Sequence, residues 1–409
     1  MSTVADTALS LSNLLRPEVR ANPYPLYHEM RSADPIHWDE PMGFWALTRH
    51  SDIMSILHDG RFSKANGLES AVRRFPADQQ ENARPVYRVF AQMMLYADPP
   101  HHTRLRGLAN KAFTPRVVER MRPHIEQIVS QLLDEALARD RMDLIQDFAY
   151  PLPATVIMEM LGLPLAERDQ FKHWSDDFMS LIGLVRHDTA QVEKARRSLS
   201  DVTDYLCDLY EQRKLRPTDD LLCALVNVGE HDGSLDRSEL VANTVLLLAA
   251  GHETTTNLIG NGMLALLRHP AQMQLLRDNP ALIDTAVEEL LRYDNPVQIV
   301  WRMPMEDIEL DGKRIERGQI VNLLVGAANR DPAQFPDPDR LDIAGRENRH
   351  IGFGLGIHFC LGSPLARLEG QLAINSLLRR MPALRLEDEP LAWHENPTFR
   401  GLHALPVAW

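Results

Sequence analysis

The chain has 409 residues, of which 44% are hydrophobic and 25% are charged, proportions typical of a folded globular protein. Its formal net charge of −13 at pH 7 argues against nucleic acid as a main partner and against attachment to an anionic membrane, because both favour a basic surface. Three cysteines in a chain of this length indicate a reducing compartment rather than a disulfide framework.

Apolar periodicity and turn residues predict a mainly helical chain with a few short strands. A short helix over residues 25–32 is followed by strands over residues 36–38 and 44–47. A second short helix is expected over residues 51–58, capped by Ser51 and ended by Gly60. Residues 100–291 follow a helical pattern almost throughout, with a long helix over residues 238–267 and another over residues 283–293.

Beyond Asn295 the pattern changes. Short strands are expected over residues 297–301, 308–310 and 320–324, with a hairpin turn at Asp311-Gly312. Residues 331–349 form a long, polar, proline-rich coil, and long irregular segments in compact domains are often functional. A helix follows from about residue 364 to residue 380.

No repeat, linker or targeting segment divides the chain. Residues 1–20 lack the pattern of a secretory signal, and the most apolar stretch, residues 240–251, is too short to span a bilayer. We therefore expect a cytoplasmic monomer without a membrane anchor. An N-terminal extension over residues 1–21 would precede one domain over residues 22–409.

The segment from Phe353 to Gly362 holds Cys360 just before a predicted helix. Gly354 and Gly356 permit backbone conformations that other residues disfavour. The amino terminus of the helix carries free N–H groups and partial positive charge, which favour the thiolate. This arrangement suits a thiolate that binds a metal, although a lone cysteine beside a tight turn is more often a buried structural residue.

The surrounding residues decide between these readings. Phe353, Gly356, Cys360 and Gly362 match the pattern Phe-x-x-Gly-x-x-x-Cys-x-Gly, which resembles the haem-binding signature of the cytochrome P450 family. The resemblance covers nearly the whole chain. It implies a mainly α-helical fold with small β regions, in which haem b (iron protoporphyrin IX) lies between two helices and Cys360 ligates its iron.

Residues 250–255 lie inside the long predicted helix. Gly251 weakens the helix and Thr254 can compete for a backbone carbonyl, so a local bulge or kink is expected. Glu253 and Thr254 resemble the acid–alcohol pair that delivers protons to bound oxygen in this family, with glutamate where many members carry aspartate. The resemblance also places Ala250 and Gly251 against the haem. Without it, the sequence would suggest an ordinary helix with a threonine cluster.

Two further sets of residues match the family. Glu289 and Arg292 share a helix face and resemble its Glu-x-x-Arg motif, which implies a buried structural trio completed by Arg340. Four residues match positions that bind the haem propionates, and Phe353, Gly354 and Gly362 also contribute to the cofactor site. The four propionate candidates are His102, Arg106, Arg302 and His358.

The resemblance implies a monooxygenase that inserts one atom of O2 into a small, largely apolar substrate, with electrons from a separate ferredoxin and its reductase. Residues 67–96 and 171–192 would roof the pocket, and a basic face (Arg104, Lys111, Arg116, Arg349, Arg367) would receive the donor. Two alternatives stay open: a peroxide-driven haem-thiolate peroxygenase and a haem sensor without turnover. The expected substrate-binding residues are Leu246, Ala249, Val297, Ile299 and Phe399.

Overall fold

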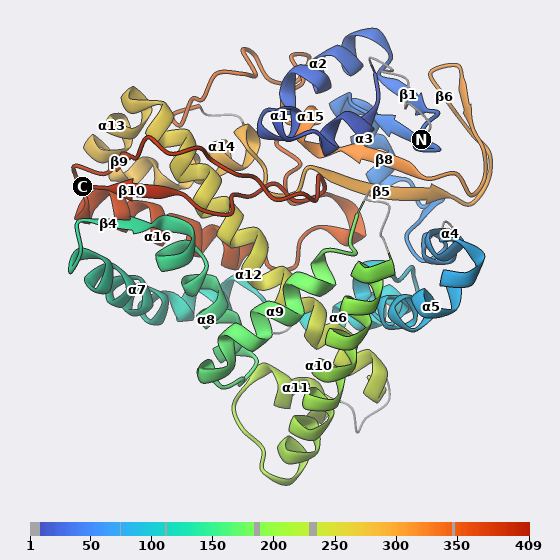
Figure 1. Cartoon of the computed structure of the whole chain (residues 1–409), viewed down its shortest axis with the longest axis horizontal. Coiled ribbons are helices and arrows are strands. Elements are labelled where there is room, and N and C mark those ends of the chain that lie inside the picture. The colour runs from blue at the N-terminus through green and yellow to red at the C-terminus, as the bar shows by residue number, and fades with distance from the viewer. Residues whose placement is uncertain (1–8, 74, 111–112, 184–188, 229–234, 346–347) are drawn as a thin grey trace.

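A computed structural model describes residues 9–409 except 74, 111–112, 184–188, 229–234 and 346–347 (Figure 1). The described chain is mainly helical, as the sequence predicts. The α-helices are α1 (Pro17–Ala21), α2 (Tyr24–Ala33), α3 (His50–His58), α4 (Gly67–Arg73), α5 (Ala77–Ala91), α6 (His101–Asn110), α7 (Pro115–Leu137), α8 (Pro151–Met160), α9 (Arg168–Met179), α10 (Thr189–Leu215), α11 (Leu221–Val228), α12 (Arg237–Arg268), α13 (Pro270–Asp278), α14 (Ile283–Tyr293), α15 (Val325–Ala328) and α16 (Ser363–Arg380). Short 3-10 turns lie at Leu11–Leu15, Met94–Tyr96, Leu165–Glu167, Pro280–Leu282 and Gly356–His358, and a π-helical turn at Ile145–Ala149.

The strands gather into small sheets. The largest has the order β1-β2-β8-β5-β3, in which only β2 and β8 are parallel. A second has the order β4-β10-β9, and β6 pairs with β7. The strands are β1 (Ile36–Asp39), β2 (Phe44–Leu47), β3 (Phe62–Ser63), β4 (Arg141–Asp143), β5 (Ile299–Pro304), β6 (Ile308–Leu310), β7 (Lys313–Ile315), β8 (Val321–Leu324), β9 (Arg385–Leu386) and β10 (Pro406–Ala408).

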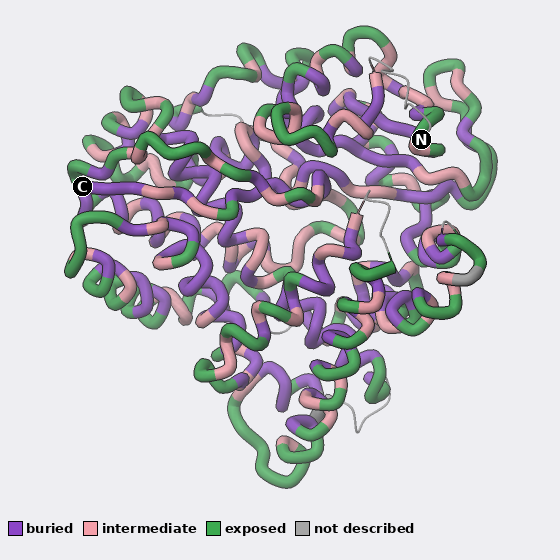
Figure 2. Tube along the Cα trace, viewed as in Figure 1, coloured by how far each residue is buried: buried purple, intermediate pink, exposed green. Residues whose placement is uncertain are grey.

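Helix α12 crosses the middle of the molecule, with the largest sheet on one side and α9 and α10 on the other (Figure 1). It begins with a capping box, in which the Asp236 side chain accepts from the Glu239 amide and the Glu239 side chain accepts from the Asp236 amide. It packs against α8, α14 and α16, and its Gly251 lets Ile157 of α8 approach closely. Buried segments fill this interior, whereas residues 214–219, at the end of α10 and before α11, are exposed (Figure 2).

Several predicted boundaries need correction. Helix α3 begins at His50 rather than Ser51 and its N-cap is Arg49 without a side-chain cap, whereas it ends at His58 as predicted. The strand predicted over residues 297–301 runs instead over Ile299–Pro304, and Val297 makes only an isolated bridge to Phe399. The bulge expected near Gly251 does not interrupt α12, which is helical throughout.

Other local predictions are confirmed. Helix α14 has the predicted bounds, and Asp311 and Gly312 both have positive φ (51° and 74°) in the turn between β6 and β7. The described part of residues 331–349 contains neither helix nor strand. In the part of the chain that the structure covers, no helix is both long and apolar enough to cross a membrane.

Candidate haem-thiolate site

The Cys360 loop is built by backbone hydrogen bonds and glycine. The Cys360 amide donates to the Phe353 carbonyl at 2.9 Å, which closes the loop. Gly356 has φ +70°, and a Cβ there would lie 2.6 Å from the Leu57 carbonyl oxygen, so only glycine fits without a shift. Helix α16 starts at Ser363, directly after the loop, as the sequence suggests. Cys360 is thereby held at the amino terminus of this helix.

Two opposing effects act on the ionisation of Cys360. Burial raises the pKa of its thiol, while the amides of Gly362 and Ser363 and the charges of Arg106 and Arg367 lower it only in part. Desolvation therefore outweighs the helix amides, which favour the thiolate as the sequence predicts. Coordination to a metal would deprotonate the thiol outright.

A charged network anchors the loop to α14. The Arg367 guanidinium lies 4.5 Å from the Phe353 ring centroid and binds Glu288 through two bonds of 2.6 and 2.9 Å. His350 adds a third contact to Glu288 at 3.1 Å. Arg367 and His350 together lower the pKa of Glu288 to about 2, against the effect of burial. Phe353 is therefore positioned by groups on α14 and α16. Phe359, directly before Cys360, is 38% exposed and therefore covers the sulfur less than its apolar ring would suggest.

Helix α12 is uncovered at one place. From Glu239 to Leu266 every residue is buried except Ala250, Gly251, Glu253 and Thr254. Ala250 is exposed and the other three are half-buried, although they lie in the middle of the molecule. The Thr254 hydroxyl donates to the Ala250 carbonyl at 3.0 Å. We refer to these four residues as the α12 window, and accessible surface in a packed interior marks space for another group.

Two buried carboxyl groups lie on the core helices. One oxygen of Glu253, Oε2, is buried without a hydrogen bond. Burial, and then Asp176 of α9, raise the pKa of Glu253 to about 8. Glu369 on α16 is 1% exposed, and burial raises its pKa to about 8 although Thr255 of α12 opposes the shift. Both groups therefore hold a proton near neutral pH. Sequence reasoning missed Glu369, because only packing buries it.

The four propionate candidates form a cationic cluster. The His102 and His358 rings lie 4.4 Å apart between centroids. Arg302 is 5% exposed, and among the described residues it has no carboxylate in salt-bridge contact. Burial lowers the pKa of Arg302 to about 10. The pKa of His358 falls to about 2, from burial and then from nearby cations, of which Arg302 has the largest effect. A site with excess positive charge suits an anion.

The Glu289–Arg292 pair is buried and Arg340 takes an unexpected part in it. Both side chains are less than 10% exposed, and Arg292 binds Glu289 through two bonds of 2.7 and 2.8 Å. The expectation that the Arg340 side chain completes a buried trio is wrong, because that residue is exposed. Its backbone carbonyl accepts from Arg292 instead, at 2.9 Å. Two further carbonyls, of Asn329 and Pro338, complete the partners of Arg292.

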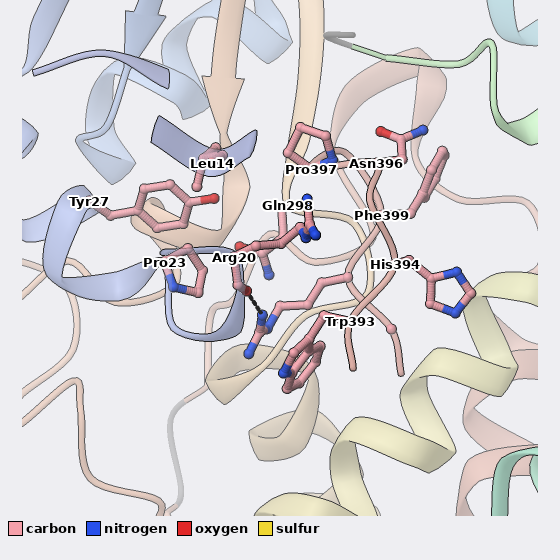
Figure 3. Close-up of a pocket in the computed structure, with 12 residues that line it drawn as sticks. Leu14, Arg20, Pro23, Tyr27, Gln298, Trp393, His394, Asn396, Pro397 and Phe399 are labelled. Atoms are coloured by element: carbon pink, nitrogen blue, oxygen red, sulfur yellow. Dashed lines mark hydrogen bonds between the residues drawn. The ribbon is translucent and has the colours of Figure 1, made fainter. Parts of the chain in front are cut away.

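The expected substrate-binding residues do not all lie in the same hydrophobic cluster. Leu246 and Ala249 lie on α12 just before the window, Val297 pairs with Phe399, and all four belong to or pack against the main hydrophobic core. Ile299 packs elsewhere, in the cluster that buries the N-terminal Leu11 and Leu14. Figure 3 shows a cavity beside Phe399, but at about 20 Å³ it has room for roughly one water molecule and not for an organic substrate.

The end of the expected roof is docked onto the chain near Phe399. The Asn396 side chain donates to the carbonyls of Met179 and Ile182, at 3.3 and 2.8 Å. Within the roof, Asp177 of α9 accepts from Ser198 of α10 at 2.6 Å. Residues 74 and 184–188 of the expected roof lie outside the described chain.

The expected basic face is only partly available. Arg104 is paired with Glu239, and Arg367 is engaged with Glu288. Lys111 lies outside the described residues. Arg116 and Arg349 are exposed.

A family model described as Cytochrome P450 matches residues 69–392. The chain belongs to the cytochrome P450 family. Cytochrome P450 CYP107DY1 of Priestia megaterium is 44% identical over 89% of each chain, and the cytochrome P450 monooxygenase PikC of Streptomyces venezuelae is 42% identical over 95% of this P450 and 91% of PikC. A crystal structure of P450BioI, in complex with an acyl carrier protein ligated to hexadec-9Z-enoic acid, has a TM-score of 0.89 at 39% identity and covers 98% of this chain and 100% of that one.

Membership of the family makes this P450 a monooxygenase and implies a haem-thiolate cofactor. The residues present fit that group. Cys360 is a thiol at a helix amino terminus whose pKa is raised by burial, the α12 window leaves interior surface uncovered, and Arg302 forms no salt bridge with a carboxylate among the described residues. The structure thus offers a sulfur ligand, a face and a counter-charge for one cofactor.

Proposed function

We propose that this P450 holds haem b through Cys360 and inserts one atom of O2 into a small, largely apolar substrate by hydroxylation or epoxidation. The observation that carries the proposal is the α12 window, where the helix between Glu239 and Leu266 is uncovered only at Ala250, Gly251, Glu253 and Thr254. When bound, haem supplies the binding and reductive activation of dioxygen.

The chain's own residues hold and move protons at this window. Glu253 has a pKa of about 8, so its carboxyl group is protonated near neutral pH and can donate. The Thr254 hydroxyl is oriented by its bond to the Ala250 carbonyl, which leaves its oxygen free to accept a hydrogen bond. We assign Glu253 as the proton source and Thr254 as the group that relays or positions the proton.

Binding of the cofactor falls to Arg302, Arg106, His102 and His358. Charge-assisted bonds from arginine to carboxylates are strong, so the two arginines would hold the propionates. Both histidines have lowered pKa values and would donate as neutral rings. Phe353, Gly354 and Gly362 shape the loop that presents the sulfur.

Leu246, Ala249, Val297 and Phe399 would contact the substrate. Leu246 and Ala249 precede the window on α12, and Val297 and Phe399 form a bridge with each other. Among the relatives, one structure is of CYP267B1 in complex with myristic acid and another of CYP109E1 in complex with testosterone. A screen should therefore include fatty acids, steroids and macrolides, and a shift of the Soret band from low to high spin would identify a ligand.

Electrons would come from a ferredoxin and its reductase. The exposed Arg116 and Arg349 support docking of an acidic donor. Turnover with ferredoxin, reductase and O2 is compared with turnover driven by peroxide. Efficient turnover by peroxide alone would favour the peroxygenase, and a lack of turnover with any spin-shifting compound would favour a sensor.

The ligation itself is tested with Cys360→Ser. We expect the reduced carbon-monoxide complex of the wild type to absorb near 450 nm and the variant to lose that band. A matched control is Cys207→Ser, which removes a thiol on α10. If Cys360→Ser keeps the band, the sulfur is not the ligand and the proposal is refuted.

A further inference from the structure

Lys64 is a buried lysine in the same part of the fold as Arg302. It directly follows β3, which pairs with β5 so that Ser63 lies opposite Met303, the neighbour of Arg302, and Lys64 lies close enough for the charge of Arg302 to act on it. Lys64 is 6% exposed. Its Nζ lies 4.5 Å from the Trp301 ring centroid and 5.7 Å from that of Tyr96. The pairing of β3 with β5 therefore places two cations near each other in the interior.

Burial of these two neighbouring cations is energetically unfavourable unless an anion is present. Like charges on opposite strands repel, and burial removes the screening of water. Among the described residues, Lys64 has no carboxylate within salt-bridge distance. Burial lowers the pKa of Lys64 well below its usual range, and Arg302 lowers it further. Cation–π contact with Trp301 offsets only part of this cost.

The surrounding charges do not balance. Asp98 is the carboxylate that acts on Lys64, Arg302 and His102, and Arg106 is the third cation near His358. Its oxygens already accept from the Ser63 hydroxyl and the Lys64 amide. If His102 and His358 are neutral, the three cations and the one carboxylate together carry a net charge of +2. Haem b carries two propionates, and the surplus equals their charge only if Lys64 is counted.

We propose that Lys64 is a further cofactor-binding residue, whose ammonium group compensates a haem propionate together with Arg302. The assignment rests on the proposed haem site. Its sequence context conceals it, because a lysine after a two-residue strand resembles an ordinary surface residue. In the fold, the pairing of β3 with β5 and the contacts with the rings of Tyr96 and Trp301 bury the Lys64 side chain.

The test measures how fast haem leaves the ferric holoenzyme for excess apomyoglobin. We expect Lys64→Met, which keeps length and apolar contact with Trp301, to lose haem about 10- to 100-fold faster, the range for loss of one charge-assisted bond. Lys64→Arg should restore the wild-type rate to within about threefold. Lys214→Met is the control, because Lys214 also lies over a ring, that of Tyr210, but on α10.

A second measurement separates the charge from packing. Wild-type and Lys64→Met apoproteins are reconstituted with haem or with haem dimethyl ester, which lacks the propionate charges. The difference between the two proteins should disappear with the ester. If Lys64→Met does not accumulate, Lys64→Gln replaces it. Loss of haem at the wild-type rate, or equal acceleration with haem and ester, would overturn the assignment while leaving Cys360 ligation intact. A wild-type protein that binds no haem overturns both.

Discussion

Replacement of Arg292 tests how the buried Glu289–Arg292 pair stabilises the fold. Arg292→Met keeps most of the volume but removes five donated hydrogen bonds. Two go to Glu289 and three to the carbonyls of Asn329, Pro338 and Arg340, at 2.7 to 3.1 Å. The variant leaves the Glu289 carboxylate, 6% exposed, without its counter-charge.

The magnitude follows from these stranded groups. Breaking a buried ion pair by removal of one partner costs roughly 3–5 kcal/mol. Glu289 keeps two donors, the Asp342 amide and the Asn348 side chain, which limits the loss. The stranded carbonyls add to it, so we expect the free energy of unfolding to fall by about 4 kcal/mol or more. Typical domains have only about 5–15 kcal/mol in total.

Urea unfolding followed by far-UV circular dichroism measures this loss as a shift of the midpoint at constant slope. Arg340→Ala is the matched control. Because its side chain is exposed and only its carbonyl binds Arg292, we expect a cost below about 1 kcal/mol. If Arg340→Ala costs as much as Arg292→Met, the Arg340 side chain takes part in the pair and the reasoning is wrong.

Three further predictions concern the core helices and the Cys360 loop. Thr254→Ala should raise hydrogen peroxide release per electron consumed, and unchanged coupling would remove Thr254 from proton delivery. Because burial raises the pKa of Glu369 to about 8, the folded state retains a proton that the unfolded state loses near pH 4.5. The wild type should therefore lose stability as pH rises from about 4.5 to 8, by up to about 1.4 kcal/mol per unit for this group, and Glu369→Gln should show a shallower dependence, because only the contribution of Glu253 remains. Parallel pH curves for the two proteins would contradict it. Gly356→Ala should destabilise the loop by about 1–3 kcal/mol and lower haem content, since its Cβ would meet the Leu57 carbonyl. Normal haem content and stability would show that the loop can shift.

The sequence by itself determined what depends on neighbours along the chain. Helix α14 was predictable because its apolar residues repeat at helical spacing, and the Asp311-Gly312 turn because those residues tolerate positive φ. The Cys360 loop was recognisable for the same reason, since its glycines, cysteine and phenylalanine lie within ten residues. The four residues of the α12 window also lie within five positions of a single helix, so the sequence shows them as one group.

Only the tertiary structure decided what depends on distant partners. Whether Arg340 offers its side chain or its carbonyl to Arg292 depends on how the coil after α15 folds back over α14. Lys64 is buried because β3 pairs with a strand some 240 residues later, and Glu369 because α16 packs on α12. Burial also raises the pKa of Cys360, against the effect of the helix amides that the sequence predicts. Desolvation and charge compensation are set by everything within a few ångströms, and local sequence patterns do not contain that information.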